Sequence, residues 1–335
     1  MSRKYSETPA ALGGLVGTAA ILPAAWITYS KLFVDHNLPL PDAIPAAKAR
    51  FTSESAGNIS YYHDKSSSGR PLLLIHSVNA AASAYEMRPL FEHYRGERPV
   101  YAVDLPGYGF SDRAARNYTA EFFERAIIDL VEDEIGEPVD AVALSLGSEF
   151  LARAAQAKPD WFHSITLISP SGFNARGGGR ATQRVSANEN SDTAYKLLAF
   201  PIWGQALFDL IASRRSIQFF LEKSFVGDPP DEFVDYSYLT SHQPGAANVP
   251  LHFVSGRLFT PDVKTAVYEK VTIPGLIIYD EDYYSQFDTL PSLVGQKENW
   301  QAARITPTRG LPHWERLPEV IETLNIFWQN HAQQV

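Results

Sequence analysis

The feature that most constrains the fold is a series of short apolar segments separated by longer mixed stretches. The segments cover residues 71–75, 99–103, 140–144, 164–168 and 274–279. Apolar residues run through each one without alternating with polar residues, as is typical of strands buried on both faces. Between the second and third segments, apolar residues recur at the steps of an amphipathic helix: Phe123, Ala126, Ile127, Leu130, Val131 and Ile135. This order predicts an α/β fold, a mostly parallel sheet flanked by helices.

Composition narrows the functional classes. With 335 residues, the chain is long enough for one large core with insertions. Its formal net charge of −9 disfavours a nucleic-acid partner, because a phosphate backbone requires a basic surface. The sequence has no cysteine, which excludes disulfides, a thiolate nucleophile and cysteine-bound metal. We expect no cofactor and no metal, and a small molecule as the partner.

The N-terminal segment, residues 1–34, is expected to anchor the chain in a membrane. No charged side chain occurs between Thr8 and Ser30, and about 20 mostly apolar residues suffice to span a bilayer. Arg3 and Lys4 precede this run, which favours a cytoplasmic N-terminus. Two alternatives remain: a cleaved signal peptide, although no clean A-x-A site follows, and a helix packed on the protein's own core. Apart from the anchor, we expect a cytoplasmic protein.

Prolines and spacing divide the rest of the chain. Pro39, Pro41 and Pro45 fall in residues 35–55, which we interpret as a stiff linker. The α/β core is expected at residues 56–173 and 270–335. Between Gly172 and Val271, roughly 100 residues far exceed an ordinary connection. We therefore predict an inserted, mainly helical lid at residues 174–269.

The sequence around Ser145 indicates a nucleophilic turn between a strand and a helix. Such a turn strains the serine backbone and needs small residues two positions away on either side, here Ala143 and Gly147. It points the serine at the positive end of a helix and lets the Leu146 N–H face a developing oxyanion. The alternative is a serine that only caps the helix.

Two further motifs precede this turn. Residues 73–79 read Leu-Leu-Ile-His-Ser-Val-Asn, and residues 104–112 read Asp-Leu-Pro-Gly-Tyr-Gly-Phe-Ser-Asp. In this order, with the Ser145 turn, they resemble the α/β-hydrolase superfamily, and more narrowly an uncharacterised bacterial subgroup of it. The resemblance runs from about residue 56 to the C-terminus, apart from the lid. It implies the α/β-hydrolase fold, with the Val78 and Leu146 N–H groups as the oxyanion hole. Ser77 departs from the family, which usually has glycine there.

The resemblance also implies a histidine base downstream of the serine and the acid. His313 satisfies that order, because it follows an expected strand at residues 304–308 and precedes a helical pattern at residues 318–328. Many members carry Gly-His three residues earlier, at the position of Gly310 in this chain. A surface-loop histidine is the alternative for His313. The other histidines fit no triad position, and His76 is expected to be structural.

The acid is expected in the loop after the strand at residues 276–279. Asp282 is the first choice for orienting the histidine, and Asp280 and Asp288 remain alternatives. A metal site is disfavoured, because no histidine neighbours these carboxylates in the sequence.

These residues predict a serine hydrolase of carboxylic ester-like bonds that acts through Ser145, His313 and Asp282. Apolar residues of the lid, which could instead form the lid's own core, suggest an apolar small-molecule or lipid-like substrate: Phe200, Trp203, Phe208, Leu210, Phe219, Phe220 and Leu221. The alternatives are an acyltransferase or a C–C hydrolase with the same residues, or a non-catalytic binding protein on this fold.

Overall fold

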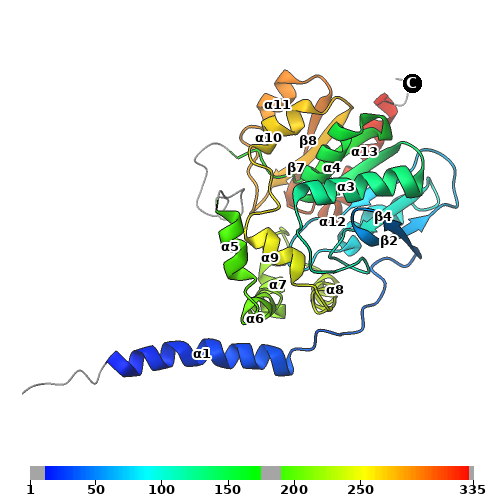
Figure 1. Cartoon of the computed structure of the whole chain (residues 1–335). Coiled ribbons are helices and arrows are strands. Elements are labelled where there is room, and N and C mark those ends of the chain that lie inside the picture. The colour runs from blue at the N-terminus through cyan, green and yellow to red at the C-terminus, as the bar shows by residue number, and fades with distance from the viewer. Residues whose placement is uncertain (1–11, 175–189, 332–335) are drawn as a thin grey trace, which may run out of the picture.

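The computed structural model describes residues 12–174 and 190–331 and is organised around one sheet of eight strands (Figure 1). The strand order is β1-β2-β4-β3-β5-β6-β7-β8. Their bounds are β1 (Ala47–Ser53), β2 (Gly57–Asp64), β3 (Leu72–Ile75), β4 (Val100–Asp104), β5 (Val139–Leu144), β6 (Phe162–Ile168), β7 (Gly275–Glu281) and β8 (Trp300–Arg309). The strands from β3 to β8 are parallel, whereas β1 and β2 pair in antiparallel fashion. The mostly parallel sheet expected from the sequence is therefore confirmed.

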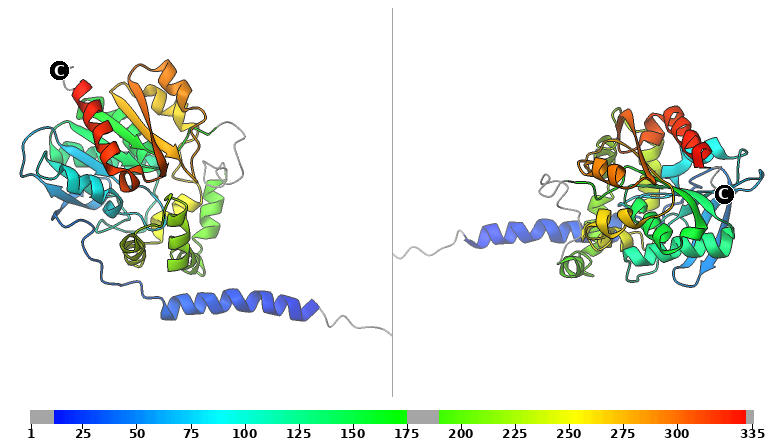
Figure 2. Two further views of the ribbon diagram at one scale, coloured as in Figure 1. Left: turned by 180° about the vertical axis from the view of Figure 1, so that it is seen from behind. Right: turned by 90° about the horizontal axis from the view of Figure 1, so that it is seen from above.

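Helices cover both faces of this sheet (Figures 1 and 2). One face packs on α3 (Ala120–Asp129) with the π-helical turn η2 (Leu130–Ile135), α4 (Gly147–Ala157), α10 (Val263–Ala266), η5 (Tyr268–Lys270) and α11 (Leu290–Gln296). The other packs on η1 (Ala84–Met87), α2 (Arg88–Tyr94) and α13 (Leu317–His331). Alternate residues of β3 enter opposite cores, Leu73 and Ile75 on the first face and Leu72 and Leu74 on the second. This double burial explains why the segment is apolar throughout.

The expected linker at residues 35–55 is wrong in its second half. Residues 47–53 form β1, which pairs with β2 from Ala47 opposite His63 to Ser53 opposite Gly57. Along β1 only Phe51 and Ser53 are buried, because the strand lies at the edge of the sheet. Its sequence therefore lacks the apolar run that marks the central strands.

The first half of this segment is not a free spacer. Tyr236 of α8 (Asp231–Ser241) donates its hydroxyl hydrogen bond to the Pro41 carbonyl at 3.1 Å. Gln243 donates from Nε2 to the Leu38 carbonyl at 2.7 Å. These contacts hold the proline-containing segment against the helices described next.

A group of helices, here called the helical insertion, lies between β6 and β7 and stands beside the sheet (Figure 1). It consists of α5 (Ser191–Leu198), α6 (Gly204–Ile211), α7 (Arg214–Glu222), α8 and α9 (Asn248–Val254). Phe208, Ala212 and Leu251 are buried in a small core of its own. The lid boundaries at residues 174–269 stay a prediction, and residues 175–189 lie outside the described part of the chain.

The N-terminal helix α1 (Leu12–Phe33) packs on this insertion. Trp26 donates from Nε1 to the Ala206 carbonyl at 2.7 Å, and Ser30 donates from Oγ to Asp209 Oδ2 at 2.6 Å. Asp209 is almost fully buried and also lies 2.9 Å from Nε2 of His36. Figure 1 shows the C-terminal end of α1 beside the insertion and the rest of the helix projecting away from the fold.

The prediction of a transmembrane anchor at residues 1–34 is therefore corrected. Within residues 12–174 and 190–331, no helix is both long and apolar enough to cross a membrane. Gly13, Gly14, Gly17 and Pro23 lower the hydropathy of the run. The alternative of a helix packed on the protein's own core is not observed either, because α1 contacts α6 through Trp26 and Ser30 while Tyr29, Leu32 and Phe33 are exposed.

A buried carboxylate holds the glycine-rich turn after β4. Asp104 Oδ1 accepts the Ala84 N–H and Oδ2 accepts the Phe110 N–H, both at 2.9 Å. Gly109 has a φ of +49°, and a Cβ at this residue would lie 1.9 Å from the Asp104 carboxyl carbon. Only glycine fits there, so the turn has a structural role.

We expect Gly109→Ala to lower the free energy of unfolding by about 2 kcal/mol or more, because the added methyl group overlaps Asp104. Gly136→Ala is the matched control, since Gly136 also has a positive φ of +76° but has no atom within 4 Å of its Cβ position. Urea unfolding measures both. An equal loss in the two variants would contradict the steric explanation.

Candidate active site

Ser145 occupies a strained turn between β5 and α4, at the carboxyl edge of the sheet. Its φ is +50°, a left-handed conformation that costs an L-residue roughly 1–2 kcal/mol. The Ser145 N–H donates to the Ile168 carbonyl at 2.8 Å, which ties the turn to the end of β6. The alternative of a capping serine is not observed, because α4 begins without a side-chain capping hydrogen bond.

The Ser145 turn packs directly on the loop after β3. A Cβ at Gly147 would lie 2.4 Å from the His76 carbonyl oxygen, so the two backbones touch and only glycine fits. His76 is structural, because its Nε2 accepts the Leu105 N–H at 2.9 Å. Burial lowers the pKa of His76 to about 3, which keeps the ring neutral and able to accept this bond.

Two backbone N–H groups belong to residues close to this contact in the sequence. Val78 lies two residues after His76, and Leu146 directly precedes Gly147. Neither donates a hydrogen bond to an acceptor among the described residues. Both side chains are buried, which fixes the backbone that carries these groups. Ser77 does not have a positive φ, so the loop does not require the glycine usual in the family.

Glu86 of η1 fixes the loop that carries Val78. It is a buried carboxylate whose Oε2 accepts the Ser77 N–H at 2.7 Å. Its Oε1 accepts hydrogen bonds from the Ser77 hydroxyl at 3.0 Å and from Asn79 Nδ2 at 2.9 Å. Burial raises the pKa of Glu86, and these three donors oppose that shift. The serine at position 77 thus supplies a hydrogen bond that glycine could not.

Of the three candidate acids, Asp280 has both carboxylate oxygens bound to residues of β8. Its Oδ1 lies 2.7 Å from Arg304 Nε, and its Oδ2 accepts the Thr308 N–H at 2.8 Å. Although burial opposes it, this hydrogen bonding holds the pKa of Asp280 below its usual value. Asp280 therefore joins β7 to β8. Asp288 is exposed, in the segment before α11.

Asp282 has one oxygen available. Its Oδ1 accepts the N–H groups of Tyr284 at 2.6 Å and Ser285 at 3.2 Å, whereas its Oδ2 accepts no hydrogen bond from the described residues. Burial raises the pKa of Asp282 to about 6. The position facing Oδ2 belongs to Gly310, where a Cβ would lie 3.6 Å from that oxygen.

His313 lies in α12 (Pro312–Glu315) and is completely buried. Its Nε2 is 2.8 Å from the Glu86 carbonyl oxygen, which also accepts from Trp314 Nε1 at 2.7 Å. Because a carbonyl only accepts, Nε2 carries the proton, and Nδ1 is the unprotonated nitrogen. Nδ1 is buried without a hydrogen-bond partner, and burial lowers the pKa of the ring to about 4. The alternative of a surface-loop histidine is not observed, and neither ring nitrogen contacts Ser145 or Asp282.

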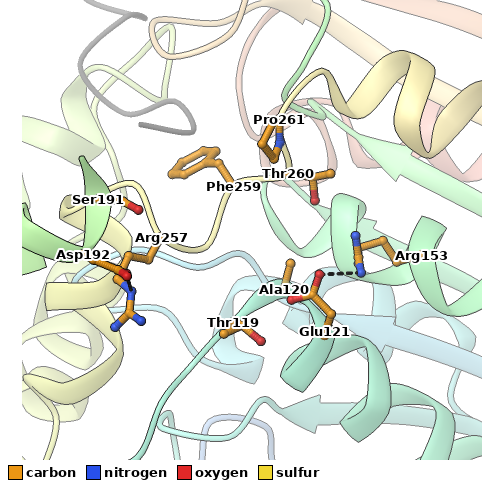
Figure 3. Close-up of a pocket in the computed structure, with 10 residues that line it drawn as sticks. All are labelled: Thr119, Ala120, Glu121, Arg153, Ser191, Asp192, Arg257, Phe259, Thr260 and Pro261. Atoms are coloured by element: carbon orange, nitrogen blue, oxygen red, sulfur yellow. Dashed lines mark hydrogen bonds and ion pairs between the residues drawn. The ribbon is translucent and has the colours of Figure 1, made fainter. Parts of the chain in front are cut away.

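A cavity of about 280 Å³ lies elsewhere, between α3, α4 and residues 257–261 (Figure 3). Two arginines line it, and each is paired with a carboxylate: Arg153 with Glu121 at 2.8 Å and Arg257 with Asp192 at 2.9 Å. Its lining includes neither Ser145 nor Asp282.

Glu86, the residue that links these parts, has no recognisable signature in the sequence. Its carboxylate holds the Ser77–Asn79 loop, and its carbonyl holds His313 and Trp314. The only signal was an acidic residue between Tyr85 and Met87 in an apolar stretch, which carries no known motif.

We expect Glu86→Ala to lower the free energy of unfolding by about 2 kcal/mol, because it leaves buried donors of Ser77 and Asn79 unpaired. Glu92→Ala is the control, since Glu92 forms an exposed ion pair with Arg88 one turn along the same segment. Thermal unfolding compares the two. Equal, small losses would show that the Glu86 network does not hold the loop.

Substitution of Asp282 by asparagine should raise the free energy of unfolding at neutral pH, whereas the same substitution of Asp280 should lower it. The folded state raises the pKa of Asp282 above the roughly 3.9 of an unfolded chain. Stability should then fall as pH rises from about 4 to about 6, and Asp282→Asn should remove this fall and stabilise the protein at neutral pH by about 2 kcal/mol. Asp280→Asn should destabilise it, because Arg304 loses its carboxylate. Urea unfolding across this pH range checks both signs, and destabilisation by Asp282→Asn would contradict the assignment.

Parts of the sequence are similar to known proteins. YugF, an uncharacterized hydrolase of Bacillus subtilis (strain 168), is 27% identical over 128 residues, which are 38% of this chain and 46% of that protein. The 1-acylglycerol-3-phosphate O-acyltransferase ABHD5 of Rattus norvegicus is 30% identical over 146 residues, 42% of this chain and 37% of that protein. The chain thus spans less than half the length of these relatives.

The structural similarity and the match to a family model point to the same family. A thermophilic esterase from Thermogutta terrifontis has a TM-score of 0.65 to this structure at 16% identity, covering 85% of this chain and 99% of that chain. The model of the alpha/beta hydrolase family matches residues 72–322, three quarters of the sequence. With its eight-stranded sheet and the strained serine turn after β5, the chain belongs to the alpha/beta hydrolase family.

Proposed function

We propose that this chain is a serine hydrolase of carboxylic ester-like bonds, and that it transfers the acyl group of an apolar ester first to Ser145 and then to water. The observation that carries the proposal is the Ser145 backbone, held at a φ of +50° where the loop after β3 touches Gly147. The Val78 and Leu146 N–H groups of these two segments donate to no acceptor in the described part of the chain. A strained conformation of this kind persists only where the surrounding structure enforces it, and such residues cluster at active sites.

In this mechanism the Ser145 hydroxyl attacks the carbonyl carbon of the ester. The Val78 and Leu146 N–H groups donate to the oxyanion that forms, and each such donor contributes about 3 kcal/mol of transition-state stabilisation. The alcohol leaves with a proton, and water then releases the acid from the acyl-enzyme. The start of α4 adds the positive end of an 11-residue helix.

Asp282 is the acid in this proposal, because its Oδ2 is available whereas both oxygens of Asp280 are engaged. His313 remains the base predicted from the sequence. For either of its nitrogens to reach Ser145, the ring would have to leave the Glu86 carbonyl.

The preference for an apolar substrate follows from side chains of the helical insertion. Phe208 is buried in the insertion's own core, but other aromatic residues are exposed, among them Phe219 at 48% and Phe220 at 42%. The Phe220 ring lies 6.5 Å from that of Tyr284, whose N–H donates to Asp282. An apolar surface thus begins beside the proposed acid.

Acyl transfer to an alcohol instead of water is the second candidate. It uses the same acyl-enzyme, and only the acceptor differs. The observation in its favour is the similarity to ABHD5, which is named an acyltransferase.

We expect a fluorophosphonate probe to label the folded protein at Ser145, because phosphonylation uses the same nucleophile and oxyanion donors as acylation. Ser145→Ala should abolish the labelling, and Ser148→Ala is the control because the Ser148 hydroxyl is buried and donates to the Ala143 carbonyl. Intact-protein mass spectrometry with peptide mapping reads the result. Labelling that persists in Ser145→Ala would assign the nucleophile to another residue.

A further inference from the structure

The carboxylate of Asp282 has one oxygen that accepts no hydrogen bond within the described part of the chain. Two backbone N–H groups fix Oδ1, and Oδ2 is left to face Gly310. No arginine, lysine or histidine among the described residues forms an ion pair with it. A Cβ at Gly310 would make ordinary van der Waals contacts, 3.6 Å from Asp282 Oδ2 and 3.8 Å from the Ser224 carbonyl oxygen, so a side-chain atom fits at this position and Gly310 leaves it unfilled.

His313 does not fill this position. Its Nε2 proton goes to the Glu86 carbonyl, which Trp314 shares, and its Nδ1 is buried without a partner. Trp314 also packs between rings, with Phe233 at 4.9 Å and Tyr85 at 5.7 Å between centroids. These contacts hold α12 against η1 and assign His313 a packing role.

We propose that the position in front of Asp282 Oδ2, which Gly310 leaves without a side chain, is taken by an imidazole that the substrate carries in its acyl part. This inference rests on the proposed acyl transfer through Ser145 and replaces His313 as the base. A protonated nitrogen is the group that an unpaired carboxylate oxygen in partly buried surroundings binds best.

The proton balance of the step is as follows. The nitrogen base accepts the Ser145 hydroxyl proton as the bond from Oγ to the carbonyl carbon forms, and Asp282 accepts a hydrogen bond from the protonated base. The proton passes to the leaving oxygen as the bond between that oxygen and the carbonyl carbon breaks. In the second half, the base takes a proton from the attacking water and returns one to Ser145.

The first test adds imidazole to the full-length wild-type protein and follows hydrolysis of p-nitrophenyl acetate. We expect a saturable rise in rate of at least about tenfold, since a positioned base contributes about 10²–10⁴-fold. The rise should be absent in Ser145→Ala and strongly reduced in Asp282→Asn. A rise that is linear in imidazole and equal in wild type and Ser145→Ala would be catalysis in solution and would overturn the proposal.

The second test places the base on the chain. Gly310→His should hydrolyse the ester at least about tenfold faster than wild type without imidazole, and its response to imidazole should disappear. Gly310→Ala is the matched control, with the same strain at a φ of +84° but no nitrogen, and should gain no activity. Should Gly310→His fail to fold, the imidazole test on the wild type decides alone.

The third test uses the substrate as the carrier. Ethyl 3-(imidazol-4-yl)propanoate keeps its imidazole in the acyl part through both halves of the reaction, and ethyl 3-phenylpropanoate is the control without a nitrogen base; we expect the wild type to prefer the imidazole ester in a manner that Asp282→Asn removes. Equal rates for the two esters would exclude a base carried by the substrate.

The outcomes separate this inference from the proposed function. Fluorophosphonate labelling of Ser145 without any effect of imidazole or Gly310→His would leave the serine mechanism standing and refute the base site. Loss of that labelling in a folded His313→Gln would assign the base to His313 instead. No labelling of Ser145 in wild type, with imidazole or in Gly310→His would refute the serine mechanism itself.

Discussion

The contact between the Ser145 turn and the loop after β3 is the constraint on which the site depends. Gly147 lies so close to the His76 carbonyl that no side chain fits between them, and the Ser145 N–H is bound to the end of β6. The neighbouring strands β3, β5 and β6 therefore fix the serine at its left-handed φ of +50°. The same contact places the Val78 and Leu146 N–H groups in the two segments that meet there, which is the requirement for a preorganised oxyanion site.

The hydrogen bonds that Glu86 accepts are a second constraint on the site. One residue uses its carboxylate to hold the Ser77 loop and its carbonyl to hold α12, so it joins two segments that are more than 200 residues apart. A buried carboxylate is stable only when its oxygens are satisfied, which explains why Ser77 and Asn79 stand beside it. As a consequence, His313 is held to the Glu86 carbonyl by its proton-bearing nitrogen. Asp282, two strands away from Ser145 in the sheet, keeps a free oxygen that faces a glycine.

Much of the fold could be predicted from the sequence, for a definite reason. Strands buried on both faces must be apolar throughout, so β3 to β7 appear as uninterrupted runs, and the helix α3 appears through its spacing. The edge strand β1 has one exposed side and buries only Phe51 and Ser53, so its pattern did not distinguish it from a linker. The N-terminal segment was long enough for a membrane helix, but its glycines and proline lowered the hydropathy, and the contacts of Trp26 and Ser30 with α6 have no signature in the sequence.

The sequence by itself determined the sheet, the serine turn and its small neighbours, because these follow from local backbone geometry and from burial on two faces. It also named Asp282 and His313 as candidates, because their order along the chain is a one-dimensional property. Only the tertiary structure decided which partners those side chains have. Hydrogen bonds between distant segments place His313 on Glu86, Asp280 on Arg304 and Thr308, and Gly310 in front of Asp282. The direction in which a side chain points after a loop of a few residues depends on what packs against that loop, and spacing along the chain does not record it.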